Sequence, residues 1–197
     1  MTVHEVLPVA DEDPKPPSFP PIRKRDQAAC PAPFRTGGYR QWASKSYVDP
    51  KRIGIWGWSY GGFMASKVLE VNEGIRSLGI SVAPVTSWLM YDSIYTERYM
   101  NLPELNPGGY VNASISHVEG FKNANFLLAH GSGDDNVHYA NSAHLIDMLT
   151  SEQVRGWRFR MFTDSDHSIT KRGGNREVYE FMTEFLVEKW GKGELLN

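Results

Sequence analysis

From Tyr39 onward, the hydrophobic and polar positions of this chain follow a pattern that predicts alternating strands and helices. Short apolar runs between turn residues are typical of buried strands, and apolar residues at helical spacing are typical of helices packed on a core. Since a strand, a helix and another strand in succession form a parallel crossover, the sequence predicts an α/β fold with a mostly parallel sheet. Strands are expected at 53–56, 78–83, 126–129 and 157–162, and helices ending near Tyr47, from 60 to a stop at Gly74, at about 140–150 and at 177–190.

The first part of the chain carries no such periodicity. Eight of the twelve prolines lie within residues 1–33. Proline has no backbone N–H to donate and fixes its own φ angle, so it interrupts regular structure. We therefore expect residues 1–38 to be a Pro-rich irregular segment and residues 39–197 to form the folded domain.

Composition and charge narrow the class of protein. The 197 residues are 41% hydrophobic and 22% charged, which suits one soluble domain with a sizeable core. The net charge of -2 and the absence of a long basic run give no electrostatic basis for binding nucleic acid. No apolar stretch is long enough to span a bilayer, and the first thirty residues lack the apolar core of a signal peptide. Cys30 is the only cysteine, so an intrachain disulfide is excluded.

Residues 57–61 read Gly-Trp-Ser-Tyr-Gly and lie between a predicted strand and a predicted helix. This is the setting of a nucleophile elbow, in which a serine sits on a strained turn at the top of an α/β-hydrolase sheet. We expect the two glycines of the motif to remove Cβ atoms that would collide where the chain reverses. The sequence predicts Ser59 as a nucleophile and the Tyr60 N–H as an oxyanion donor. A purely structural strand-to-helix turn is the alternative.

In this fold the acid and the histidine of a triad follow the serine in that order, each on a loop after a later strand. His167 fits, because it follows the strand at 157–162 and precedes the last helix. The remaining histidines occupy tail, loop or helix positions. His130 and His138 lie near aspartates, but they lack a tight pair with a third ligand, so no metal site is expected.

The acid has several candidates. Asp134 and Asp135 are adjacent in the loop after the third predicted strand, and spacing alone does not choose between them. Asp164 and Asp166 also compete, but they share the loop of the histidine. The orienting carboxylate normally comes from a different loop, which favours the pair at 134 and 135.

Three blocks, at 57–62, 82–100 and 130–138, closely resemble the prolyl oligopeptidase family, and within it the dipeptidyl peptidase IV branch that includes fungal dipeptidyl aminopeptidases. The resemblance runs from about Trp42 to the C-terminal helix. It implies Ser59 as nucleophile, Asp134 as orienting acid and His167 as general base, with no cofactor. The reaction it implies is release of N-terminal Xaa-Pro or Xaa-Ala dipeptides from peptide substrates, through an acyl-enzyme on Ser59.

The resemblance also implies a substrate pocket. In the family an aromatic box receives proline or alanine, because a flat pyrrolidine ring stacks well on rigid aromatic walls and a larger side chain would clash. Asn136 matches a residue that holds the carbonyl of the substrate's first residue. Core packing beside the elbow is the alternative explanation for the aromatic residues. The positions that match the box are Tyr60, Val85, Trp88, Tyr91, Tyr95 and Val137.

Family members carry the first half of the hydrolase sheet and a large β-propeller upstream of the nucleophile, but only 58 residues precede Ser59 here. We therefore expect a truncated version of a larger enzyme, whose β-propeller would complete the site, and we find no match for the family's second oxyanion donor. The resemblance implies a homodimer and a membrane-anchored full-length form in the secretory or vacuolar lumen, and Asn112 begins a glycosylation sequon.

Two other functions remain open at this point. A different α/β hydrolase, such as an acylaminoacyl peptidase or an esterase, would share the triad but not the Tyr91 and Tyr95 box. A truncated, non-catalytic remnant would keep an intact-looking site without turnover.

Overall fold

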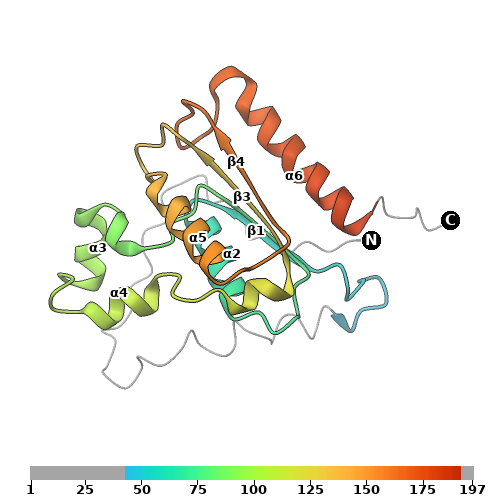
Figure 1. Ribbon diagram of the computed structural model, residues 1–197, viewed down its shortest axis with the longest axis horizontal. Helices are drawn as coiled ribbons and strands as arrows, with labels where there is room; N and C mark the ends of the chain where they lie inside the picture. The colour runs from blue at the N-terminus through green and yellow to red at the C-terminus, as the bar shows by residue number, and fades with distance from the viewer. Residues whose placement is uncertain (1–42, 192–197) are drawn as a thin grey trace.

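The computed structural model describes residues 43–191, and its centre is a parallel sheet in the order β1-β2-β3-β4 (Figure 1). Every pairing in this sheet is parallel, with Ile55 opposite Gly79 and Ile80 opposite Leu127. The α/β class with a mostly parallel sheet is confirmed. The strands are β1 (Gly54–Trp58), β2 (Leu78–Val82), β3 (Asn125–Gly131) and β4 (Trp157–Phe162).

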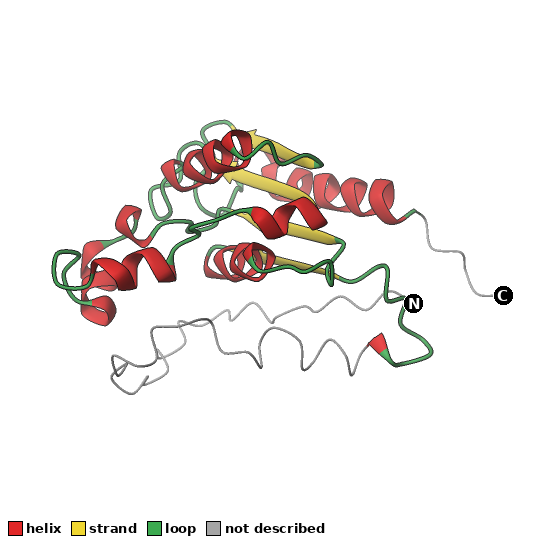
Figure 2. Ribbon diagram, turned by 60° about the horizontal axis from the view of Figure 1, so that its bottom comes forward, coloured by secondary structure: helices red, strands yellow, loops and turns green. Residues whose placement is uncertain are grey.

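Helices cover both faces of the sheet, with α2 and α5 on one side and α6 on the other (Figure 2). The helix α2 ends at Glu70, before the stop expected at Gly74, and α6 begins before the predicted Glu177. The elements are α2 (Tyr60–Glu70), α3 (Ser93–Met100), α4 (Pro107–Ala113), α5 (Ala140–Ser151) and α6 (Gly174–Trp190), with 3-10 turns η1 (Trp88–Met90), η2 (Glu119–Asn123) and η3 (Lys171–Gly173).

The alternation of side chains along the strands divides the core in two. Phe126 and Leu128 of β3 point toward α2 and α5, while Leu127 and Ala129 point toward α6. Neighbouring residues of a strand face opposite sides, so a strand covered by helices on both faces is apolar throughout. This explains why the apolar runs were readable as strands from the sequence.

The connection between β2 and β3 contains α3 and α4, which the sequence did not reveal. Both helices are short, with eight and seven residues, and each has a single buried side chain, Thr96 in α3 and Tyr110 in α4. Asp92 and Asn106 cap their first turns with side-chain hydrogen bonds. The two helices lie beyond the carboxyl ends of the strands, where ligands bind in open α/β sheets (Figure 2).

Several expectations concern residues outside the described range. The Pro-rich segment at 1–38, its boundary with the folded domain and the start of the helix expected to end near Tyr47 lie there. In the described range only Ala43 is helical and residues 44–47 form turns and a bend, so the prediction that this helix continues to Tyr47 is wrong. Within residues 43–191, no helix combines the length and the apolar character needed to cross a bilayer.

Candidate active site

Ser59 is the single residue between the end of β1 and the start of α2. Its backbone has φ 58 and ψ -120, a combination that is costly for any residue with a side chain. Two hydrogen bonds hold it there. The Ser59 N–H donates to the Val82 carbonyl at 2.8 Å, and the Ser59 carbonyl accepts from the Phe63 N–H at 3.0 Å. The partly exposed serine therefore sits on a strained turn at the carboxyl edge of the sheet.

The glycines around this turn have unequal roles. A Cβ at Gly57 would overlap the backbone carbonyl group of Gly61, and a Cβ at Gly62 would lie 3.0 Å from the Val82 carbonyl oxygen. A Cβ at Gly61 itself would meet no atom within 4 Å. The expectation that Gly61 removes a colliding Cβ is therefore wrong, because it is the Gly61 backbone that approaches Gly57.

We expect Gly57→Ala to destabilise the fold by about 3 kcal/mol or more, because the new methyl group meets backbone that cannot move aside. Gly61→Ala is the matched control, and its free energy of unfolding should stay within about 1 kcal/mol of the wild-type value. Urea denaturation followed by circular dichroism measures both. Equal losses in the two variants would contradict this assignment.

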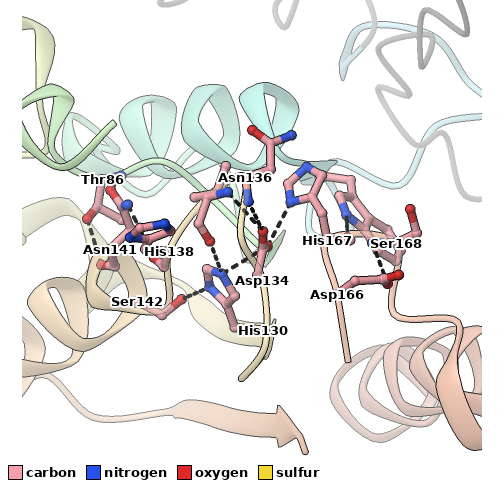
Figure 3. A network of polar contacts seen from close by, with 12 residues as sticks. Thr86, His130, Asp134, Asn136, His138, Asn141, Ser142, Asp166, His167 and Ser168 are labelled. Carbon is pink, nitrogen blue, oxygen red and sulfur yellow. Dashed lines mark hydrogen bonds and ion pairs between the residues drawn. The ribbon is translucent and has the colours of Figure 1, made fainter. Parts of the chain in front are cut away.

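His167 and Asp134 meet at the same edge of the sheet (Figure 3). The His167 Nδ1–H donates to Asp134 Oδ2 at 2.7 Å. The other oxygen, Oδ1, accepts from the N–H groups of Asn136 at 3.0 Å and Val137 at 2.8 Å. The two loops are close because they follow β3 and β4, which are neighbours in the sheet.

The other candidate carboxylates are exposed or have other partners. Asp135 is exposed, and Asp164 forms an ion pair with Arg172 at 3.3 Å. Asp166 accepts from the Ser168 N–H at 3.2 Å. Among the described residues, Asp134 is the carboxylate that is hydrogen-bonded to His167.

A further bond ties the histidine loop to the elbow. The Trp58 Nε1–H donates to the His167 carbonyl at 3.0 Å, and Trp58 directly precedes Ser59. Within residues 43–191, no hydrogen bond joins the Ser59 hydroxyl to the His167 ring. In structures without substrate, such bonds are often long and tighten only in the reacting complex.

The Asp134 carboxylate is charged although its side chain is fully buried. Burial alone would raise its pKa. Hydrogen bonds from His130, His167 and the Val137 N–H, together with the charge of His167, outweigh burial and hold the pKa well below its usual range. The site therefore keeps a negative charge against His167 at neutral pH.

An aromatic cluster lies beside the elbow, built around Trp88, which is 6% exposed. Trp88 stacks on Tyr95 with ring centroids 6.1 Å apart, and it meets Tyr91 edge-on at 5.8 Å. The ring centroid of Tyr60 also lies 6.1 Å from that of Trp88, in a tilted arrangement. These ring separations are those of mutually favourable aromatic pairs.

A polar contact joins the aromatic cluster to the loop that carries Asp134, in which the Tyr91 hydroxyl donates to Asn136 Oδ1 at 3.1 Å. Val85 and Val137 are buried, at 2% and 0% exposure. Partial burial, followed by the neighbouring Tyr95, raises the pKa of Tyr60 above its ordinary value.

Comparison with known proteins shows the family of the chain. The model of the prolyl oligopeptidase family matches residues 36–193. The chain belongs to the prolyl oligopeptidase family. Its relatives in the family include proteins named "Probable dipeptidyl-aminopeptidase B" from Sclerotinia sclerotiorum, 53% identical over 158 residues, and Neurospora crassa, 47% identical over 160 residues.

These matches cover 79% and 80% of this chain, but the chain spans only 17% of the length of each relative. Among solved structures of the family, the dipeptidyl peptidase 4 of Porphyromonas gingivalis superposes with a TM-score of 0.71 at 35% identity. That match covers 77% of this chain and 21% of the other.

Sequence reasoning missed one residue that shapes the site of this family member. Asn141, in the first turn of α5, is fully buried, and its side-chain oxygen accepts from the N–H groups of Thr86 at 2.9 Å and Ser87 at 3.2 Å. Its amide nitrogen donates to the carbonyls of Met90 and His138. Asn141 thus fixes the segment that carries Trp88 to the acid loop.

A signal for Asn141 is present in the sequence. Asn141 lies four residues before Leu145 and eight before Leu149, so it occupies the face of α5 that packs in the core. A buried amide must be hydrogen-bonded, which makes a polar residue on an apolar helix face a candidate for a structural contact.

Among the described residues, no group of three or more metal-ligating side chains is arranged to hold an ion. His130 instead hydrogen-bonds Ser142 Oγ and the Val137 carbonyl.

Proposed function

We propose that this chain carries the catalytic centre of a serine dipeptidyl peptidase, with Ser59 as nucleophile, His167 as general base and Asp134 as orienting acid. The observation that carries the proposal is the 2.7 Å hydrogen bond between His167 and a buried, charged Asp134, beside the strained turn at Ser59. An imidazole whose Nδ1–H is held by a carboxylate leaves Nε2 free to accept a proton.

The reaction begins when His167 Nε2 takes the proton of the Ser59 hydroxyl and Oγ attacks the peptide carbonyl carbon. The oxyanion that forms is stabilised by the backbone N–H of Tyr60, which lies at the start of α2, where N–H groups lack intrahelical partners. His167 then protonates the leaving amine, and the dipeptide remains on Ser59 as an ester. Water, activated by the same histidine, releases it.

The aromatic cluster supplies the specificity in this proposal. A proline or alanine at the second position of the substrate enters between Tyr60, Trp88 and Tyr95, above the buried Val85 and Val137. Asn136 accepts from the Tyr91 hydroxyl through its oxygen, which turns its amide nitrogen outward as a donor for a substrate carbonyl. The names of the relatives support a dipeptidyl aminopeptidase.

For the whole protein we propose what the family resemblance implies: a β-propeller that completes the site, a homodimer, and a membrane-anchored form in the secretory or vacuolar lumen. Asn112 is proposed as a glycosylation site. It is exposed on α4, whereas the Ser114 hydroxyl of the same sequon is buried and accepts from the Trp88 N–H at 3.0 Å. The glycan would therefore have to be added before this region folds.

Hydrolysis of three chromogenic substrates tests the proposal. The chain should release p-nitroaniline from Gly-Pro-p-nitroanilide and leave acetyl-alanine-p-nitroanilide intact. Preference for the acetylated substrate would favour an acylaminoacyl peptidase, and turnover of p-nitrophenyl butyrate alone would favour an esterase. A folded chain that hydrolyses none of the three would favour a non-catalytic remnant.

We expect Tyr95→Ala to lower kcat/KM for Gly-Pro-p-nitroanilide by roughly 10- to 100-fold, because it removes the ring that stacks on Trp88. Tyr99→Ala is the matched control. Tyr99 lies on the same helix and contacts Tyr95 at 5.1 Å, outside the rings that surround Trp88, so its loss should cost only a few-fold. Steady-state kinetics measures kcat/KM for both variants. An equal loss of kcat/KM in the two would mean that the substrate pocket does not lie at Tyr95.

A further inference from the structure

His130, at the end of β3, is fully buried and contacts both the acid loop and α5 (Figure 3). Its Nδ1 lies 2.7 Å from the Ser142 hydroxyl, and its Nε2 lies 2.8 Å from the Val137 carbonyl oxygen. The same Nε2 lies 3.2 Å from Asp134 Oδ2, the oxygen that also accepts from His167. One buried ring therefore touches the beginning and the end of the loop that carries the acid.

The hydrogen-bond partners of the His130 ring indicate which of its nitrogens carries a proton. A backbone carbonyl can only accept, so the proton of His130 lies on Nε2 and is directed at Val137, within reach of Asp134. The Ser142 hydroxyl can donate to Nδ1 or accept from it. When it donates, the ring is the neutral Nε2–H tautomer and both nitrogens are satisfied, as burial requires.

The contact also completes the surroundings of the carboxylate. An ionised carboxylate offers about four acceptor positions. Here three are filled, by the N–H groups of Asn136 and Val137 on one oxygen and by the His167 ring on the other. The His130 Nε2 lies 3.2 Å from that second oxygen and so occupies the remaining side of the carboxylate. A carboxylate filled in this way has one orientation, and His167 is bound in that orientation.

We propose that His130 is a positioning residue for Asp134, and that Ser142 sets its tautomer. The proposal rests on the proposed function of Asp134. Ser142 is itself fully buried on α5, next to Asn141, which hydrogen-bonds the segment that carries Trp88. Two successive residues of α5 thus position the two parts of the site. Ser142 acts on the acid through His130, and Asn141 acts on the substrate pocket through Thr86.

Two substitutions at His130 separate positioning from packing. His130→Phe keeps a flat ring but removes both hydrogen bonds, and we expect kcat to fall roughly 10- to 100-fold with KM nearly unchanged, as for other residues that orient a functional ligand through one contact. His130→Gln retains a donor and an acceptor at the end of its side chain, and it should recover most of this loss. Ser142→Ala, which removes only the partner of Nδ1, should act in the same direction by a few-fold.

A readout independent of activity is ¹⁵N NMR of the full chain labelled at histidine. In the wild type His130 should appear as the neutral Nε2–H tautomer, and the resonance of the His167 Nδ1–H should move in His130→Phe and return toward its wild-type position in His130→Gln. If the wild-type chain shows no hydrolysis, the proposed function fails, while these resonances still decide the positioning role. If His130→Phe does not fold, the same shift in Ser142→Ala supports the proposal.

A different tautomer in the wild type would overturn the proposal. So would a folded His130→Phe variant with an unchanged His167 resonance. A folded His130→Gln variant as impaired as His130→Phe would do the same, because it would show that ring shape rather than hydrogen bonding matters.

Discussion

Asp134→Asn is expected to lower kcat by about 10⁴-fold, the size of the effect when the acid of a serine triad is replaced by its amide. An amide nitrogen in place of Oδ2 would donate toward His167 rather than accept from it. His167 would then be held with its proton on Nε2, facing Ser59, and could not accept the serine proton. The volume of the side chain hardly changes, so packing is not the cause.

Asp135→Asn is the matched control, because it makes the same change of charge and shape at an exposed neighbour. Its kcat should stay within about threefold of the wild-type value. Steady-state hydrolysis of Gly-Pro-p-nitroanilide, with circular dichroism to establish folding, measures both. A larger loss of kcat in Asp135→Asn than in Asp134→Asn would show that Asp135, and not Asp134, orients the histidine.

The same substitution should change how stability depends on pH. The pKa of Asp134 is lower in the folded than in the unfolded chain, so its charge contributes stability above the unfolded pKa of about 3.9, and this contribution is lost as the pH falls toward the folded pKa. In Asp134→Asn the free energy of unfolding should therefore fall less steeply below about pH 4. Urea midpoints between about pH 3 and 7 measure the difference between the two slopes.

His167→Ala is expected to have a still larger effect, lowering kcat by up to about 10⁶-fold, since the serine and the histidine of a triad act as a unit. The bond from Trp58 to position 167 uses the backbone carbonyl, so the loop should keep its place in the variant. The loss would then come from the missing base.

His138→Ala serves as the control, because His138 is exposed and lies near the end of the loop between β3 and α5 that carries Asp134. Its kcat should remain within a few-fold of the wild type. Comparable losses in both variants would mean that His167 is not the base.

The strands and the elbow could be predicted from the sequence because their determinants are local. A strand buried on both faces is a largely apolar run, and Leu78–Val82, in which Ser81 is the one polar residue, appears in the structure with every residue buried. Gly57 was also correctly interpreted, because a turn from strand into helix brings backbone against backbone at that position.

What the sequence left open depends on contacts between distant segments. Spacing could not choose between Asp134 and Asp135, since only the turn that directs one carboxylate at two backbone N–H groups and at His167 distinguishes them. The family resemblance supplied that choice. Asn141 was missed for a similar reason, because its partners at 86 and 87 are more than fifty positions away in the chain.

Covalent labelling of the full chain with a fluorophosphonate probe tests whether Ser59 is an activated nucleophile. We expect one label, located by fragmentation of the tryptic peptide 53–67 on Ser59 rather than on the buried Ser66. The label should be absent from Ser59→Ala and unchanged in Ser151→Ala, a change at an exposed serine at the end of α5. A folded chain that stays unlabelled, or a label on another serine, would contradict the assignment of Ser59 as the nucleophile.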